Sequence, residues 1–255
     1  MNVLGIIQAR MSSTRLPGKV MKPILGKPML ARQLERTRRA RSLDALMVAT
    51  SVDSSDDPIE QLCASLGIDC FRGSLDDVLD RYYQAARQYR PRHVARMTAD
   101  CPLIDPEIVD RVVEFYLRGG FDHAGNGVEP RFPDGLDVEI LRFPILEYAW
   151  QHATRLSDRE HVTLFVHRQP DRFRIGSYRN DVDLSHLRWT VDEPRDFVLV
   201  ERIYEALYPK NPAFTTADIL DLLEKRPELL ALNSGIDRNE GLARSLARDQ
   251  ENSST

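Results

Sequence analysis

The chain has 255 residues, enough for one large α/β domain or two small ones. Hydrophobic residues make up 42% and charged residues 29%, so there is enough apolar material for a full core. The formal net charge of −4 disfavours a general affinity for nucleic acid, because such proteins normally carry a basic domain.

The cysteines and the apolar segments indicate the compartment. Cys63, Cys70 and Cys101 form neither a C-x-x-C pair nor an even-numbered framework, which argues against structural disulfides. The first apolar run is short, follows no basic segment and is interrupted by Arg10, so it predicts a strand and not a signal peptide. No stretch approaches the roughly 18 consecutive apolar residues of a membrane helix. We expect a cytoplasmic protein that does not associate with membranes.

Short apolar runs alternate with helical segments over about the first 120 residues. Pro28 and Pro58 each lie at the first turn expected of a helix. Strands separated by single helices of this length predict βαβ units and a parallel sheet. The expected strands are 3–9, 46–50, 70–71 and 93–98, and the expected helices are 28–40, 57–66, 78–89 and 106–117.

The alternation changes after Gly120. From residue 234 the chain is polar with few large apolar side chains, which predicts a polar tail that is disordered at its end. The absence of internal repeats and low-complexity linkers favours a single domain, residues 1–233. In this part the expected strands are 137–141, 173–178 and 187–191, and the expected helices are 144–152, 158–167, 194–208 and 217–224.

A polar loop follows the first strand and contains three cations, Arg10, Arg15 and Lys19, interleaved with hydroxyl residues and glycine. Open α/β sheets bind their ligands at the carboxyl ends of their strands. Small residues let backbone N–H groups approach phosphate oxygens, and the cations offset the charge of a triphosphate. The alternative is a solvated surface loop. No G-x-x-x-x-G-K-[ST] or G-x-G-x-x-G occurs, so the patterns of P-loop and dinucleotide-binding proteins are absent.

The loop resembles the opening of the cytidylyltransferases that make CMP-activated sugar acids. Residues 9–19 match the pattern Ala-Arg-x-x-Ser-x-Arg-Leu-Pro-x-Lys throughout, and the whole chain is similar to the relatives described as spore coat polysaccharide biosynthesis proteins. The resemblance implies a three-layer α/β/α sandwich of the nucleotide-diphospho-sugar transferase type with a mostly parallel sheet. It implies that the loop binds CTP, through Ala9, Arg10, Ser13, Arg15 and Lys19.

Two aspartates end apolar strands: Asp100 in the segment 97–103, and Asp192 in the segment 189–194. Each alone could be a helix cap. Carboxylates at strand ends can also hold Mg²⁺, which prefers oxygen ligands. As a pair they resemble the two metal-binding aspartates of the family, so we expect Asp100 and Asp192 to bind Mg²⁺.

The stretch 71–81 lies where the family binds the cytosine base and ribose. The resemblance implies contacts from Arg72, Gly73 and Asp77. The competing interpretation is structural, with Ser74 or Asp76 capping the next helix.

Acceptor binding is expected in two later stretches, 132–139 and 158–161, which lie in the acceptor half that the resemblance implies. The first brings the carboxylates of Asp134, Asp137 and Glu139 into a turn and strand, and these could bind hydroxyl or amine groups. In the second, Arg159 could pair with an acceptor carboxylate, and His161, two residues later, is also expected to bind the acceptor. The competing interpretation is that the acids only shape a hairpin. His161 and His167 are six residues apart and no H-E-x-x-H occurs, which argues against a zinc site.

Together these features predict transfer of CMP from CTP to an acidic sugar or sugar-like acceptor with release of pyrophosphate, for surface glycan synthesis. Residues 1–119 would form the nucleotide half, and 120–233 the acceptor and dimerisation half of a homodimer. Arg10 and Lys19 would stabilise charge on the phosphates, and no general base is evident. A glycosyltransferase of similar fold would normally show an Asp-x-Asp motif, which Asp100-Cys101-Pro102 is not. A non-catalytic binding subunit is the other alternative, but it would be expected to have lost Lys19 or one aspartate.

Overall fold

The computed structural model describes residues 1–236, 238 and 240–253. Its centre is a seven-stranded sheet in the order β5-β4-β1-β6-β8-β7-β9. Strands β5, β4, β1 and β6 are mutually parallel, β8 is antiparallel to both β6 and β7, and β7 and β9 are parallel. The mostly parallel sheet expected from the sequence is therefore confirmed. The strands are β1 (Val3–Gln8), β4 (Ala45–Ser51), β5 (Asp69–Gly73), β6 (His93–Thr98), β7 (His123–Gly125), β8 (Glu139–Arg142) and β9 (Ile175–Ser177), with a separate hairpin of β2 (Pro23–Ile24) and β3 (Lys27–Pro28).

The first strand separates two hydrophobic cores. Successive side chains of a strand point to opposite faces of the sheet. Leu4 and Ile6 pack in one core, whereas Val3 and Ile7 pack in the other, and none of the four is more than 1% exposed. An apolar run that supplies both faces is typical of a central parallel strand.

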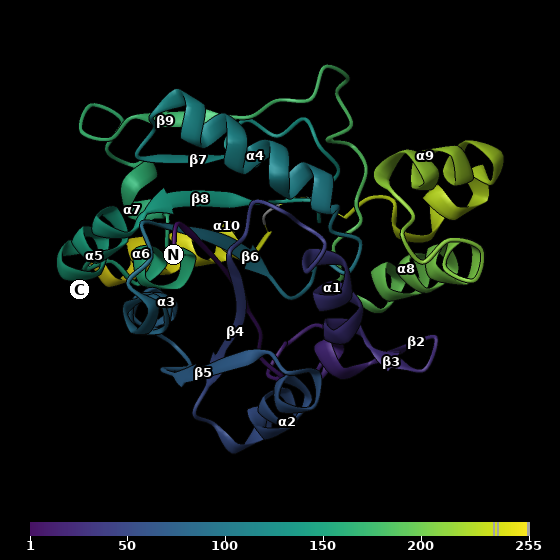
Figure 1. Cartoon of the computed structure of the whole chain (residues 1–255), viewed down its shortest axis with the longest axis horizontal. Coiled ribbons are helices and arrows are strands. Elements are labelled where there is room, and N and C mark those ends of the chain that lie inside the picture. Colours follow the sequence, from purple (N-terminus) through teal and green to yellow (C-terminus); the bar gives the residue numbers. More distant parts are fainter. Residues whose placement is uncertain (237, 239, 254–255) are drawn as a thin grey trace.

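Helices cover both faces of the sheet, which gives the three-layer α/β/α sandwich (Figure 1). The helices of the first face are α1 (Met29–Thr37), α2 (Asp57–Leu66), α4 (Pro106–Gly119) and α8 (Pro194–Leu207), and α9 (Thr216–Lys225) packs against α8. The helices of the second face are α3 (Val78–Tyr89), α5 (Phe143–His152), α6 (Leu156–His161) and α7 (Leu164–His167). Short 3₁₀ helices are η1 (Lys19–Met21), η2 (Ser54–Asp56) and η3 (Pro227–Asn233). In the described residues, no helix is long and apolar enough to span a membrane.

The strand directions decide where functional side chains can gather. The carboxyl ends of β5, β4, β1 and β6 lie at one edge of the sheet because these strands are parallel. Strand β8 runs the other way and begins at that edge, where Glu139 pairs with Arg96 of β6. The loop after β1, the residues after β6 and the residues before β8 therefore meet at one edge.

Two elements expected from the sequence differ in the structure. The single helix expected over 158–167 is two helices, because Val162 has a φ of 54° and ends α6. A left-handed conformation is strained for a β-branched residue, and Val162 is fully buried. The strand expected over 187–191 is irregular and makes one isolated parallel bridge, between Asp134 and Arg188.

The polar tail is the third difference. A polar tail that is disordered at its end was expected after residue 233, but α10 (Glu240–Ser253) is a helix that packs on α6. Asp249 accepts hydrogen bonds from the backbone N–H and the hydroxyl of Ser157, and it lies 3.5 Å from Arg168. Contacts of this kind are made by polar side chains and leave no periodic pattern of apolar residues in the sequence, which is why the composition alone suggested disorder. Residues 254 and 255 lie outside the described part of the chain.

Candidate functional site

The loop after β1 turns back on itself at the carboxyl edge of the sheet. The backbone N–H of Met11 donates to Asp56 at 2.7 Å, and its carbonyl accepts the N–H groups of Ser13 and Gly18, each at 2.9 Å. Gly18 has a φ of 68°, in the left-handed region that glycine adopts without strain. This turn starts η1 and directs Lys19 into the molecule.

Lys19 is the centre of the site. Its Nζ lies 2.7 Å from the carbonyl oxygen of Val191, 2.9 Å from Oδ1 of Asp192 and 3.3 Å from Oδ2 of Asp100. Burial works against the charged amine, but the two carboxylates outweigh it and raise the pKa of Lys19. The structure therefore brings together Lys19 and both aspartates singled out in the sequence.

Asp100 is fixed by its neighbours and is not a helix cap. Thr98 donates its hydroxyl to Oδ1 of Asp100 at 2.5 Å. The backbone N–H of Val191 donates to the carbonyl of Asp100 at 2.8 Å, which ties the end of β6 to the second aspartate segment. The cap of α4 is Asp105, whose side chain accepts from the backbone N–H of Glu107. The Asp100 carboxylate is therefore available to bind cations.

Asp192 also uses its carboxylate for cations. Arg15 and Arg188 lie 2.9 and 3.0 Å from its Oδ2. Burial opposes ionisation, but Lys19, Arg15 and Arg188 together lower the pKa of Asp192. The start of α8 is capped by a box between Glu193 and Asp196.

The donor set of the two aspartates fits a hard divalent cation. Both carboxylates lie within 3.3 Å of the same nitrogen of Lys19. A small cation at this position would have oxygen ligands from both residues, and such ions are held by one or two carboxylates with substrate phosphates. The ammonium group occupies the position that the cation would share.

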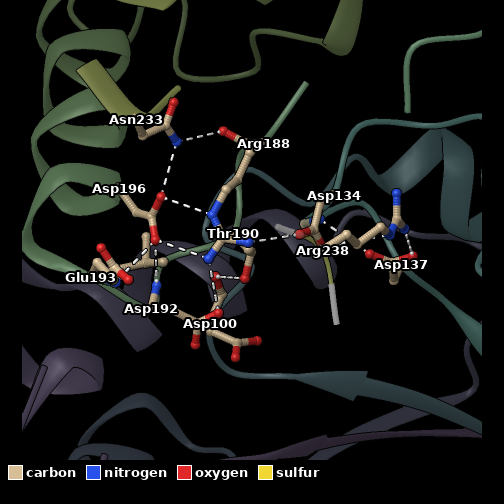
Figure 2. Close-up of polar contacts among 12 residues, drawn as sticks. Asp100, Asp134, Asp137, Arg188, Thr190, Asp192, Glu193, Asp196, Asn233 and Arg238 are labelled. Carbon is tan, nitrogen blue, oxygen red and sulfur yellow. Dashed lines mark hydrogen bonds and ion pairs between the residues drawn. The ribbon is translucent and has the colours of Figure 1, made fainter. Parts of the chain in front are cut away.

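Arg188 is a site residue that the sequence analysis missed. Its guanidinium bridges Asp192, Asp134 and Asp196, each at 3.0 Å (Figure 2). Asn233 donates to the carbonyl of Arg188 and to Asp196, both at 2.9 Å. A signal was present, because Arg188 lies four residues before Asp192 and directly before the segment 189–194, but the regular strand expected over 187–191 hid its role.

Asp134 and Asp137, expected at the acceptor side, lie next to this network. Arg238 is 2.5 Å from Asp137 and 3.9 Å from Asp134, and it donates to the carbonyl of Phe132 at 3.1 Å (Figure 2). Burial, with the charge of Asp137, raises the pKa of Asp134 to about 6. Burial also raises the pKa of Asp137, against the effect of Arg238. The acidic turn thus borders the Lys19 site, and Arg238 comes from the tail.

The stretch expected to bind the nucleoside makes several internal ion pairs. Arg72 binds Asp57 and Glu60 at 2.7 and 2.8 Å. Asp77 caps α3 and is bound by Arg159, whose Nε lies 2.9 and 3.0 Å from its two oxygens. These pairs agree with the structural interpretation of the stretch, with Asp77 as the cap in place of Ser74 or Asp76. They also give Arg159 a partner within the protein.

Three other residues expected to bind the nucleotide lie where strands end: Ala9 and Arg10 directly follow β1, and Gly73 is the last residue of β5. Arg10 is exposed. The pKa of Arg81 is lowered mainly by the burial of Arg81, and the positive charge of Arg10 adds to this effect. At Gly73 an added Cβ would lie 2.8 Å from the ring of Phe71 and 3.2 Å from Arg81, so a side chain does not fit without movement. Ala9 donates its backbone N–H to Ala49 at 3.1 Å.

The remaining acceptor candidates face the second layer of helices. Glu139 is bound by Arg96 and accepts the hydroxyl of Thr163 at 2.7 Å. Burial opposes ionisation, but Arg96 and His123 hold the pKa of Glu139 well below its usual range. His161 contacts the Ser245 hydroxyl of α10 at 2.9 Å, and burial lowers its pKa. Glu139 and His161 thus lie on one side of the sheet, away from the Lys19 contacts.

Comparisons with known proteins identify the family and agree with the fold. The cytidylyltransferase family model matches residues 4–239. The spore coat polysaccharide biosynthesis protein SpsF of Bacillus subtilis is 31% identical, over 89% of this chain and 96% of its own. A cytidylyltransferase structure from Leptospira borgpetersenii is 31% identical with a TM-score of 0.87, covering 93% of this chain and 100% of that one.

More distant structures share the fold. A CMP:2-keto-3-deoxy-manno-octonic acid synthetase complexed with CTP is 18% identical with a TM-score of 0.64, over 81% of this chain and 99% of that one. A Mycobacterium tuberculosis protein in complex with manganese is 14% identical with a TM-score of 0.58, over 79% of this chain and 99% of that one. From the match across most of its length, the chain belongs to the cytidylyltransferase family, the CTP-dependent nucleotidyltransferases.

Proposed function

We propose that the protein transfers CMP from CTP to an acidic sugar or sugar-like acceptor and releases pyrophosphate, as a step in polysaccharide or surface glycan synthesis. The observation that carries this proposal is the convergence of Lys19, Asp100 and Asp192 at the end of the CTP loop. The SpsF relative supports the glycan context, and the synthetase complexed with CTP supports an acidic-sugar acceptor.

The chemistry is attack of an acceptor oxygen on the α-phosphorus of CTP, with pyrophosphate leaving in line. Positioning and charge stabilisation carry most of such a reaction. Asp100 and Asp192 would hold Mg²⁺, which supplies charge neutralisation at the phosphates when bound. Lys19, displaced from the carboxylates, would reach the phosphates, with Arg10, Ser13 and Arg15 completing the loop.

The acceptor is proposed to bind beside the acidic turn. Asp134 and Asp137 would receive hydroxyl or amine groups of the sugar, whereas Glu139, bound by Arg96 and Thr163, is assigned no direct contact with the acceptor. Since Arg159 is bound by Asp77, we assign it to positioning α6 and His161 rather than to direct contact with the acceptor carboxylate.

A homodimer is also proposed, formed through the segment after Gly120. Phe115, Phe121 and Tyr178 line an open, partly apolar groove beside this segment. Sedimentation at micromolar concentration is expected to give a dimer, and a monomer would contradict this.

The test is pyrophosphate release from each of the four NTPs with Mg²⁺ and a panel of acidic and neutral sugars. We expect release with CTP and an acidic sugar only. Asp137→Asn should then raise the KM for the acceptor without changing the KM for CTP. Release with another NTP, or with neutral sugars alone, would reject the proposed specificity.

A further inference from the structure

Three side chains that can bind metals converge on the second face of the sheet. His123 comes from β7, Glu139 from β8 and His167 from α7, and one ligand atom of each lies within 4.8 Å of the others. Oε1 of Glu139 is 3.4 Å from Nε2 of His123 and 3.8 Å from Nε2 of His167. Two ligands bound tetrahedrally to one ion, each at about 2.0–2.2 Å, lie about 3.3–3.6 Å apart. The spacing is therefore close to that of a metal site.

His123 gives a second, independent indication. Its side chain is fully buried, and its Nε2 has no hydrogen-bond partner among the described residues. Nδ1 of the same ring lies 3.3 Å from Nε2 of His167, a hydrogen-bond contact that a metal ion bound to both Nε2 atoms would replace. Nε2 faces Oε1 of Glu139 but is not aligned for a hydrogen bond. Buried polar groups are almost always hydrogen-bonded, so a buried nitrogen that only approaches a carboxylate, at 3.4 Å and without hydrogen-bond geometry, needs an explanation.

The surroundings hold Glu139 in place for binding. Arg96 binds Oε2, and the Thr163 hydroxyl donates to Oε1 at 2.7 Å. Thr163 directly follows the strained Val162, which fixes the chain between α6 and α7. Hydrogen bonds to a ligating carboxylate orient it and are a regular part of metal sites.

We propose that His123, Glu139 and His167 bind a divalent transition-metal ion of the zinc class. Two imidazoles and one carboxylate suit such ions and leave one position open, whereas Mg²⁺ prefers oxygen ligands. His123 is buried, but Glu139 and His167 are partly exposed and give the ion a path of entry. The ion would join β7, β8 and α7, separately from the Asp100 and Asp192 pair. Because Arg96 also binds the Glu139 carboxylate and competes with the ion for its negative charge, we expect the ion to bind with micromolar affinity.

Co²⁺ is the probe, because its visible absorption reports tetrahedral nitrogen and oxygen coordination. The full chain, stripped with a chelator, is titrated with Co²⁺ in excess Mg²⁺. We expect one equivalent to bind with a visible band and a raised Tm, since a ligand specific to the native state stabilises it. His167→Gln should weaken Co²⁺ binding by about 100-fold, because replacing even the residues that only hydrogen-bond to metal ligands lowers metal affinity by 10–100-fold.

Two variants serve as controls. His152→Gln removes an exposed histidine of α5 outside the cluster and should keep the band. Asp100→Asn should also keep it, since that residue belongs to the other site. Circular dichroism checks that each variant is folded. The proposal is overturned if the wild type shows no band, if folded His167→Gln keeps it, or if Asp100→Asn abolishes it.

Discussion

Replacing Lys19 with methionine removes the charge and keeps most of the aliphatic chain. A preorganised cation at a developing negative charge is worth about 3 kcal/mol, so kcat should fall by about 10²-fold. The change also leaves Asp100 and Asp192 without their shared partner. Their side chains are 26% and 21% exposed, so the stability loss should be about 1–3 kcal/mol, below the 3–5 kcal/mol of a fully buried broken pair.

The assay is steady-state pyrophosphate release together with denaturant unfolding, each with and without Mg²⁺. Without the competing ammonium, Mg²⁺ should stabilise the variant more than the wild type. Lys22→Met is the matched control, because Lys22 follows in the same loop but lies over the ring of Phe197. Turnover within a few fold of wild type in folded Lys19→Met would refute the assigned role.

The remaining predictions concern the carboxylates. Asp100→Asn and Asp192→Asn should each abolish Mg²⁺-dependent activity, and any loss of stability, about 1–3 kcal/mol, should come from the lost pairing with Lys19 because other residues cap α4 and α8; surviving activity would count against metal binding. Folding makes ionisation of Asp134 less favourable, because the pKa of this residue is raised from 3.8 to about 6 in the native state. The stability of the wild type relative to Asp134→Asn should therefore fall as the pH rises from 3.8 to about 6, by at most about 3 kcal/mol. Equal pH profiles in unfolding would contradict this. Arg159→Ala and Asp77→Asn should show a double-mutant coupling of about 1 kcal/mol or more in unfolding, and additive effects would mean that the pair is not formed.

The nucleotide-side elements could be predicted because local patterns determine them. The apolar run of β1 and the helix signals at Pro28 and Pro58 predicted strands and helices within a few residues of those observed. Asp100 and Asp192 could be paired in advance because each ends an apolar run and together they resemble the two metal-binding aspartates of the family, although only Asp100 follows a strand of the sheet.

The rest depends on contacts between distant segments. The break at Val162 has no glycine or proline to announce it, and His123 and His167 are brought together only by the packing of α7 on the sheet. The ion pair of Arg159 with Asp77, and that of Arg238 with Asp137, join residues about 80 and 100 positions apart. Sequence spacing carries no signal for such pairs, so Arg159 was assigned to the acceptor and Arg238 was missed.

The most direct test of CMP transfer is to follow the phosphates of CTP. The protein is incubated with Mg²⁺, an acidic sugar acceptor, and CTP labelled at either the α- or the γ-phosphorus. Attack on the α-phosphorus predicts that the α label appears in the sugar product and the γ label in pyrophosphate, with neither transfer in Asp192→Asn. The γ label in the sugar product, or the α label released as free CMP without any product, would contradict cytidylyl transfer.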